Sequence, residues 1–181
     1  MSEGYQIYDQ NDLYFLTFQV VDWVDIFTRP SYKKVATDSF NFCRANKGLE
    51  LYAYVIMTNH IHLLARAKEP NRLSDIIRDY KKFTARTILE MIKEPSESRS
   101  DWMLKRFEFA AMSHKRNSEY QIWTHENHAI EISSRKFLQQ KMNYIHQNPV
   151  RAMIVEHAED YVFSSASNYY KNKGIIDIDF V

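Results

Sequence analysis

Two histidines separated by one residue are the first candidates for chemistry in this chain. His60 and His62 stand in a run of apolar and β-branched residues. Side chains alternate between the two faces of a strand, so both imidazoles would point to one face while Ile61 points to the other. Two neutral imidazoles on a rigid strand form a good partial site for a divalent cation. A strand that simply carries two polar residues on a wet sheet face would show the same pattern.

A tyrosine late in the chain is the candidate nucleophile. Tyr144 and Asn148 are four residues apart in a segment with helical apolar spacing, so they share one helix face. A phenol ionises near pH ~10, and a nearby dication can activate it while polarising a phosphodiester oxygen. A helix that crosses the sheet beside the histidines would supply this nucleophile and, from Asn148, a third metal ligand. Alternatively, Tyr144 is one of 12 tyrosines that pack against the sheet.

The elements that must position these residues follow strand and helix periodicities. Strands are expected at about residues 13–21, 49–57 and 60–67, and helices at about residues 30–46 and 72–93. A fourth strand is expected from residues 120–123 or 129–132. The order βαββαβ predicts an α+β fold: a ferredoxin-like antiparallel sheet with helices on one face, the other face free, and a C-terminal catalytic helix. Phe42 is among the apolar positions expected of the first helix, and Phe83 is expected on the inner side of the second.

The second half of the chain contains the helix that carries Tyr144. Residues 95–100 predict a polar surface linker, and a short helix is expected over about residues 102–115. Ser133-Ser134 predicts a helix N-cap, and Pro149 predicts a helix end at Asn148. The tail is expected to dock through Tyr161, Phe163, Tyr169 and Tyr170. We expect one domain over residues 1–181, with a core at about 13–132, a nucleophile helix at about 134–148 and a tail at 149–181.

Composition limits the classes of function. An apolar content of 45% predicts a folded globular chain, and a formal net charge of +1 means that nucleic-acid binding would rest on a local patch. The single cysteine, Cys43, excludes an internal disulfide framework, and the sequence has no glycine-rich phosphate loop. No apolar run is long enough to span a membrane or to form a secretory signal. A cytoplasmic protein that does not bind membranes is expected.

Clusters of basic residues interleaved with aromatic residues predict where DNA would bind. Single-stranded DNA requires cations for its phosphates and ring faces on which its bases stack. Alternatively, the rings (Tyr80, Phe83, Trp102 and Phe107) belong to the core and the cations form a solvated helix face. The cations assigned to DNA contact are Arg78, Lys81, Lys82, Arg86, Lys105, Arg106 and Arg151, and Arg72, Lys115 and Arg116 lie in the same clusters.

Two strings of residues resemble a known family. The first runs from Tyr54 to Leu64 through His60-Ile61-His62, and the second from Asn143 to Ala152 through Tyr144. With Lys82-Phe83-Thr84, Tyr161, Ser164-Ser165-Ala166 and Tyr169, they resemble the single-tyrosine HUH transposases, most closely the REP-associated tyrosine transposases of bacteria. The resemblance covers residues 14–170. Thr58 replaces a common proline and Met153 a common glycine, so local backbone geometry differs there.

The resemblance implies a metal-dependent transposase. It implies that His60 and His62 hold Mg²⁺ or Mn²⁺, and that Tyr144 cleaves single-stranded DNA through a 5′-phosphotyrosine link. The released 3′-hydroxyl later attacks that link and rejoins strands without ATP. The expected substrate is DNA with hairpin or palindromic repeats, and the expected assembly is a monomer or a homodimer. Asn148 is the expected third ligand, with His146 or a carboxylate as alternatives.

Two other functions remain open at this stage. A replication or mobilisation nickase would use the same histidine pair and tyrosine, although 181 residues leave no room for a helicase-like extension. A DNA-binding regulator could keep the fold without catalysis. The presence of His60, His62 and Tyr144 together favours an enzyme over such a regulator.

Overall fold

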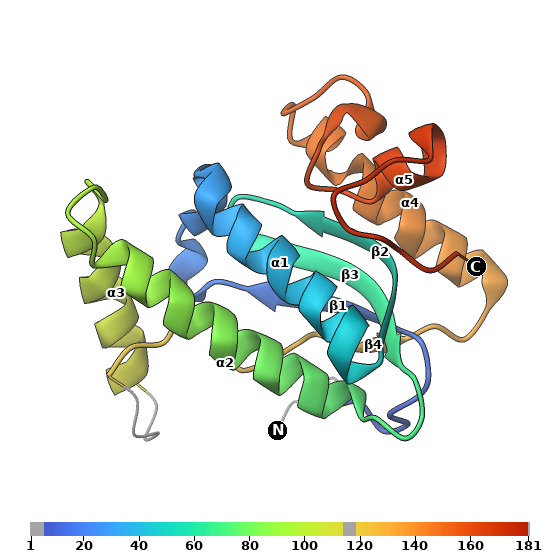
Figure 1. Cartoon of the computed structure of the whole chain (residues 1–181), viewed down its shortest axis with the longest axis horizontal. Helices are drawn as coiled ribbons and strands as arrows, with labels where there is room; N and C mark the ends of the chain where they lie inside the picture. The colour runs from blue at the N-terminus through green and yellow to red at the C-terminus, as the bar shows by residue number, and fades with distance from the viewer. Residues whose placement is uncertain (1–5, 114–118, 181) are drawn as a thin grey trace.

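The fold is a four-stranded antiparallel sheet with helices on both faces (Figure 1). The computed structural model describes residues 6–113 and 119–180. The strands, in sheet order, are β2 (Leu49–Ile56), β3 (His60–Ala67), β1 (Tyr14–Gln19) and β4 (Ile130–Glu131). The helices are α1 (Pro30–Lys47), α2 (Leu73–Ile92), α3 (Ser100–Met112), α4 (Arg135–Arg151) and α5 (Ala166–Lys171), with short 3-10 turns η1 (Val21–Trp23), η2 (Ile26–Thr28) and η3 (Ala158–Asp160).

The strand order confirms the ferredoxin-like prediction. In the described residues, the chain runs β1-α1-β2-β3-α2 and returns through α3 to β4, which pairs antiparallel with β1. The fourth strand comes from the second of the two expected segments. The first segment supplies only an isolated bridge between Trp123 and Val20. The two central strands are β3 and β1, and their antiparallel pairing places His62 opposite Thr17.

One sheet face is closed by α1 and α2, which lie side by side over it in Figure 1. Alternate strand residues, including Leu16, Ile61 and Leu63, form the main apolar core with these helices and are at most 1% exposed. At the helix–helix contact the rings of Phe40 and Tyr80 stack with centroids 4.3 Å apart. This packing is the main apolar layer of the fold.

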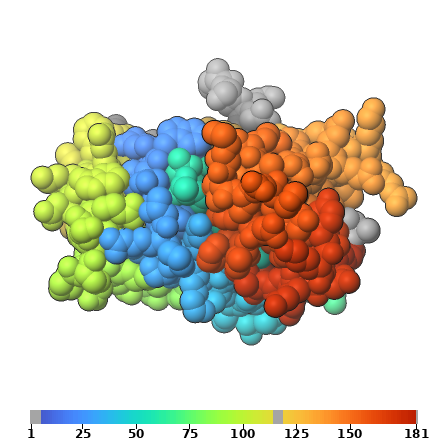
Figure 2. Space-filling view, turned by 90° about the horizontal axis from the view of Figure 1, so that it is seen from above, coloured from blue at the N-terminus to red at the C-terminus, as the bar shows by residue number. Residues whose placement is uncertain are grey.

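The opposite face is covered in part, which corrects the expectation that it would be free. A second apolar cluster joins strand residues such as Val55 and Leu64 to Ile145 of α4 and Tyr161 of the tail. The tail also reaches α1, where Lys33 Nζ donates to Tyr161 Oη at 2.9 Å. Figure 2 shows the orange and red C-terminal residues packed against blue N-terminal ones. This cover buries His62 and Leu64 in the middle of β3 and leaves His60, at the start of the strand, half-buried.

Three expected packing positions are wrong. Phe42 is 56% exposed and Phe83 is 50% exposed, because Phe40 and Tyr80 already fill the contact between α1 and α2. Tyr170 is 65% exposed, whereas Tyr169 packs at the tail and donates its hydroxyl to the Tyr52 carbonyl at 2.8 Å. In each case a ring one to three residues earlier in the sequence is packed inside instead.

The expected surface linker and the expected end of the catalytic helix also need correction. Glu97 is buried because Tyr32 donates to it at 2.7 Å and Arg29 and Arg99 pair with it. Pro149 lies inside α4, which continues to Arg151. Proline removes only its own N–H donor, and the helix beyond it still forms a bond from the Ala152 amide to the Asn148 carbonyl at 3.0 Å. Asn148 is therefore one turn before the helix end.

No helix among residues 6–113 and 119–180 is both long and apolar enough to cross a membrane.

Candidate active site

The histidine pair lies at the start of β3, on the partly covered face of the sheet. The ring centroids of His60 and His62 are 4.7 Å apart, and the His62 ring stacks on Phe15 at 5.3 Å. His62 is 6% exposed, while His60 is half-buried. The strand alternation predicted this shared face, because Ile61 between them belongs to the opposite core.

Hydrogen bonds orient both imidazoles. Asn59 Nδ2 donates to the Trp23 carbonyl at 3.3 Å, so Asn59 Oδ1 faces His60 Nδ1 at 2.7 Å. An amide oxygen only accepts, so Nδ1 of His60 carries the proton and Nε2 keeps a lone pair. His62 Nδ1 lies 2.9 Å from Thr17 Oγ1, which can accept in the same way. With both Nδ1 atoms engaged, the two Nε2 atoms are the ones suited to bind a metal.

Burial keeps both imidazoles neutral at pH 7. Burial, together with the charges of His60, Lys141 and Arg151, lowers the pKa of His62 from 6.5 to about 3. Burial also lowers the pKa of His60. A neutral imidazole is the form that coordinates a cation, so no proton has to be displaced there at neutral pH.

Helix α4 brings Tyr144 to the histidines. Ser134 caps the helix by accepting a hydrogen bond from the Phe137 amide at 3.2 Å, and Ile145 is fully buried against the sheet. The neighbouring residue, Tyr144, is 40% exposed, and its ring centroid lies 5.2 Å from that of His62 and 5.9 Å from that of Phe15. Tyr144 and the two imidazoles thus lie together on one face of the sheet, although Tyr144 and His62 are 82 residues apart in the chain (144 minus 62).

Two cations flank the Tyr144 ring. Arg151 lies over it at 4.5 Å, and its Nη2 donates to the Tyr144 carbonyl at 2.8 Å. Lys141 Nζ lies 5.8 Å from the same ring and 4.3 Å from the Phe15 ring. An anionic phosphate would be attracted here. Sequence reasoning assigned Arg151 to DNA and placed Lys141 one helical turn before Tyr144 without giving it a role. It missed Thr17, which required the β1–β3 register.

The third metal ligand stays a prediction. Asn148 is half-buried on α4, one turn beyond Tyr144. His146 is excluded as an alternative because it lies on another side of the helix, is buried, and has Nε2 2.9 Å from Ser165 Oγ. Within the described residues no set of three or more His, Cys, Asp or Glu side chains could hold a metal, so no described carboxylate completes the histidine pair.

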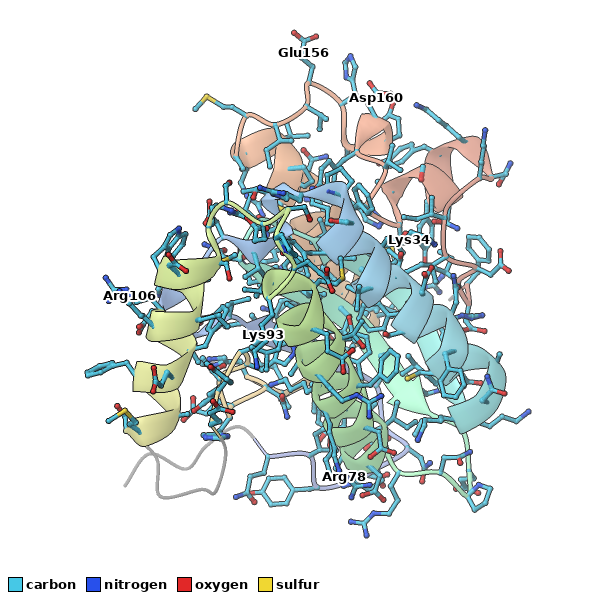
Figure 3. All side chains as sticks on the ribbon, turned by 60° about the vertical axis from the view of Figure 1, so that its left-hand side comes forward. Lys34, Arg78, Lys93, Arg106, Glu156 and Asp160 are labelled. Atoms are coloured by element: carbon cyan, nitrogen blue, oxygen red, sulfur yellow. The ribbon has the colours of Figure 1, made fainter. Side chains whose placement is uncertain are left out.

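The structure separates most of the predicted DNA contacts from this site. The four on α2 belong to the helix layer on the opposite face. Arg78 pairs with Asp75 and Asp79, and it points outward at one end of α2 in Figure 3. Arg86 lies 3.9 Å from Glu90, Lys82 is exposed, and Arg72 before the helix is exposed. Of the seven predicted contacts, Arg151 is the one that contacts Tyr144.

Lys81 and the α3 cluster differ from expectation in their surroundings. Lys81 Nζ donates to the Thr124 carbonyl at 3.0 Å, and burial lowers the pKa of Lys81 to about 7. On α3, Lys105 and Arg106 are exposed, but Phe107 is fully buried and is therefore not a stacking surface. Tyr80 is likewise buried. Lys115 and Arg116 lie outside the described residues.

Comparison with known proteins identifies the family. The family model described as "Transposase IS200 like" matches residues 16–110, which is more than half of the chain. The chain therefore belongs to the IS200-like transposase family. The matched residues include the histidine pair, whereas Tyr144 lies beyond them. No curated protein matches the sequence.

One solved structure confirms the fold, and a second is reported for comparison. A REP-associated tyrosine transposase, solved bound to a REP hairpin, superposes with a TM-score of 0.67 at 19% identity, covering 100% of this chain and 92% of that one. A candidate transposase from Deinococcus radiodurans R1 gives a TM-score of 0.44 at 19% identity, covering 81% of this chain and 98% of that one. The sequence prediction of a transposase with this fold is confirmed.

Proposed function

We propose that this chain cleaves and rejoins single-stranded DNA, with Tyr144 as the nucleophile. The observation that carries the proposal is the 5.2 Å separation between the ring centroids of Tyr144 and His62 on a partly open face. Membership in the IS200-like transposase family supports DNA cleavage and transfer as the reaction class.

In the proposed cleavage step, a bond forms between Tyr144 Oη and phosphorus as the bond from phosphorus to the 3′ oxygen breaks. The phenol loses its proton to solvent, and the departing 3′ oxygen gains one and becomes a hydroxyl. The 5′ phosphate remains on the tyrosine. Rejoining reverses these changes when a 3′-hydroxyl attacks the phosphotyrosine, so the bond energy is conserved and no nucleotide cofactor is consumed.

The side chains around Tyr144 have distinct parts in this proposal. Arg151 and Lys141 attract the phosphate and stabilise the negative charge that develops during transfer. The Phe15 ring supports the edge of the Tyr144 ring, and the Arg151 bond to the Tyr144 carbonyl holds this cation beside the nucleophile. Pre-positioning of these groups before DNA binds is the main contribution of the fold to the rate.

A divalent cation fits the donor set of the site. His60 and His62 would hold Mg²⁺ or Mn²⁺ through Nε2, because their Nδ1 atoms are engaged by Asn59 and Thr17, and Asn148 would be the third ligand. Bound there, the cation would offset the charge of the phosphodiester.

The test is covalent capture of DNA. The chain is incubated with a 3′-labelled single strand that carries a hairpin, in Mg²⁺ or Mn²⁺, and separated on a denaturing gel, because the 3′ fragment is the one that stays on the tyrosine. We expect a protein–DNA adduct with the wild type, none with Tyr144→Phe, and an unchanged amount with Tyr170→Phe, an exposed tyrosine on α5. An adduct of equal yield from Tyr144→Phe would refute the assignment.

The same assay separates the other functions. The proposed substrate is hairpin DNA, as in the REP-associated transposase solved with a REP hairpin. Strand cleavage without transfer to a second labelled strand would favour a nickase, and tight binding without any adduct would favour a regulator. An equal rate on an unstructured strand would remove the hairpin from the proposal while leaving the cleavage chemistry intact.

A further inference from the structure

An exposed tryptophan with a strained backbone lies beside the histidine pair. Trp23 is 59% exposed, and its ring centroid is 6.2 Å from that of His60, with the planes at 83°. Both Asp22 and Trp23 have left-handed backbones, with φ of 51° and 55°. Non-glycine residues adopt this region rarely and at a cost in free energy, so two in succession call for an explanation.

The turn is tied directly to the candidate active site. The Trp23 carbonyl accepts from Asn59 Nδ2 at 3.3 Å, and Asn59 Oδ1 accepts from His60 Nδ1 at 2.7 Å. On the other side, the Trp23 amide donates to the Val20 carbonyl at 3.2 Å, and the Val20 amide donates to the Asn59 carbonyl at 2.9 Å. Two short hydrogen-bond paths therefore link the indole-bearing turn to the β2–β3 connection and to His60.

Packing does not explain why an indole is placed there. A buried tryptophan would contribute apolar stabilisation, but most of this ring stays in water. Helix α3, which contacts this turn, adds a surface suited to DNA: Arg106 Nη1 lies 4.0 Å from Asp22 Oδ2, and Figure 3 shows Arg106 extending outward from α3. Trp102, one helical turn before Arg106, is 43% exposed. A ring face beside an active site, followed by an exposed cation and a second ring, is an arrangement that single-stranded nucleic acid can follow.

We propose that Trp23 is a stacking platform for a base of single-stranded DNA next to the phosphate that Tyr144 attacks. The inference rests on the proposed function, since it places that base on the His60 side of the site. The strained turn holds the indole at the rim before DNA arrives, which lowers the ordering cost of binding. From there the strand continues toward Arg106 on α3. Stacking of one base on one aromatic ring contributes about 5- to 150-fold in affinity.

Binding without cleavage tests the platform separately from the chemistry. In EDTA, fluorescence anisotropy measures binding of an oligothymidylate of about 16 nucleotides and of an abasic strand with the same phosphates. Trp23→Ala should weaken oligothymidylate binding about 5- to 150-fold and leave abasic-strand binding unchanged within about twofold. Trp23→Gly, which suits the left-handed backbone, should behave like Trp23→Ala, and Trp23→Phe should retain most of the affinity. Phe42→Ala removes an equally exposed ring on α1 and should change neither affinity.

Two outcomes overturn the platform. Equal affinity of the wild type and Trp23→Ala for oligothymidylate, or an equal loss on both strands, would mean that the ring does not stack on a base. Folding of each variant is checked by its thermal unfolding midpoint, and Trp23→Gly keeps the test valid if Trp23→Ala unfolds. A normal Tyr144 adduct together with unchanged Trp23→Ala binding would remove the platform but keep the proposed cleavage. If Trp23→Ala weakens binding of oligothymidylate alone and no adduct forms with the wild type, the platform is kept and the proposed cleavage is removed.

Discussion

The two faces of one sheet differ in what covers them. Under α1 and α2, Ile61 and Leu63 are sealed at 0% and 1% exposure, whereas on the other face α4 and the tail leave His60 half-buried at the rim. These residues alternate along one strand, so β3 serves stability with one set of side chains and offers chemistry with the other. A rigid strand with a complete core behind it can hold two imidazoles in place without weakening the fold.

The lysines on the two faces of the sheet also differ in their surroundings. Lys81 donates to main-chain carbonyls of the segment before β4, and burial lowers its pKa to about 7, so it stabilises a loop. Lys141 lies between the rings of Phe15 and Tyr144 on the other face, where its charge reaches His62. Both lysines occur in basic, aromatic-rich sequence. Basic clustering in the sequence therefore does not identify the face that carries Tyr144 and the histidine pair.

The largest expected effect comes from the histidine face. His60→Ala removes one imidazole of the proposed metal pair, so we expect adduct formation to fall at least ~100-fold. Because His60 is half-buried, the free energy of unfolding should change by less than about 1 kcal/mol. Gel assays across a Mn²⁺ titration and urea unfolding measure the two quantities. Wild-type adduct yield with an unchanged metal dependence would contradict the pairing of His60 with His62.

The matching change on the sealed face should have the opposite profile. Leu63 follows His62 and lies between its cross-strand neighbours Leu16 and Tyr54. Leu63→Ala leaves a cavity there and should lower the free energy of unfolding by about 2–5 kcal/mol. At a temperature where the variant stays folded, its adduct rate should match the wild type. Loss of activity without loss of stability would show that the two faces are not independent.

The buried His146 of α4 predicts a dependence of stability on pH. Burial lowers the pKa of His146 from 6.5 to about 4, so the unfolded chain takes up a proton that the folded chain refuses as the pH falls between these values. Stability should therefore fall with pH over that window, by at most about 1.4 kcal/mol per pH unit for this residue. Urea midpoints at pH 7, 5.5 and 4.5 should fall less steeply for His146→Gln. Parallel profiles would mean that His146 is protonated in the folded protein.

The smallest expected effect concerns the cations beside Tyr144. Lys141→Met keeps the length of the side chain but removes a charge from a partly exposed site, so we expect the adduct rate to fall about tenfold. Lys34→Met removes an exposed charge from α1 on the sealed face and serves as the control. Single-turnover rates at two salt concentrations measure both variants. A similar loss in Lys34→Met would indicate a general attraction for DNA rather than a role at the nucleophile.

Local patterns predicted most of the fold and the principal site residues. The alternation around Ile61, the left-handed Gly48 that ends α1 and the Ser134 cap all follow from contacts within a few residues. The same reasoning put Phe42 and Phe83 inside and Glu97 outside, because it could not see that Phe40 and Tyr80 fill the helix contact or that two arginines surround the carboxylate. Trp23 escaped notice because no local signal marks a strained turn whose bonding partner is 36 residues away.

The sequence by itself determined which face of β3 carries the imidazoles, because strand alternation is a property of the backbone. It also determined that Tyr144 shares a helix with Lys141, whereas only the structure showed that this helix continues to Arg151. Only the tertiary structure decided that this helix crosses the histidine face and brings Tyr144 within 5.2 Å of His62. Its position depends on apolar burial shared by β1, β2, β3, α4 and the tail, and such a sum over distant residues cannot be obtained from any one stretch of sequence.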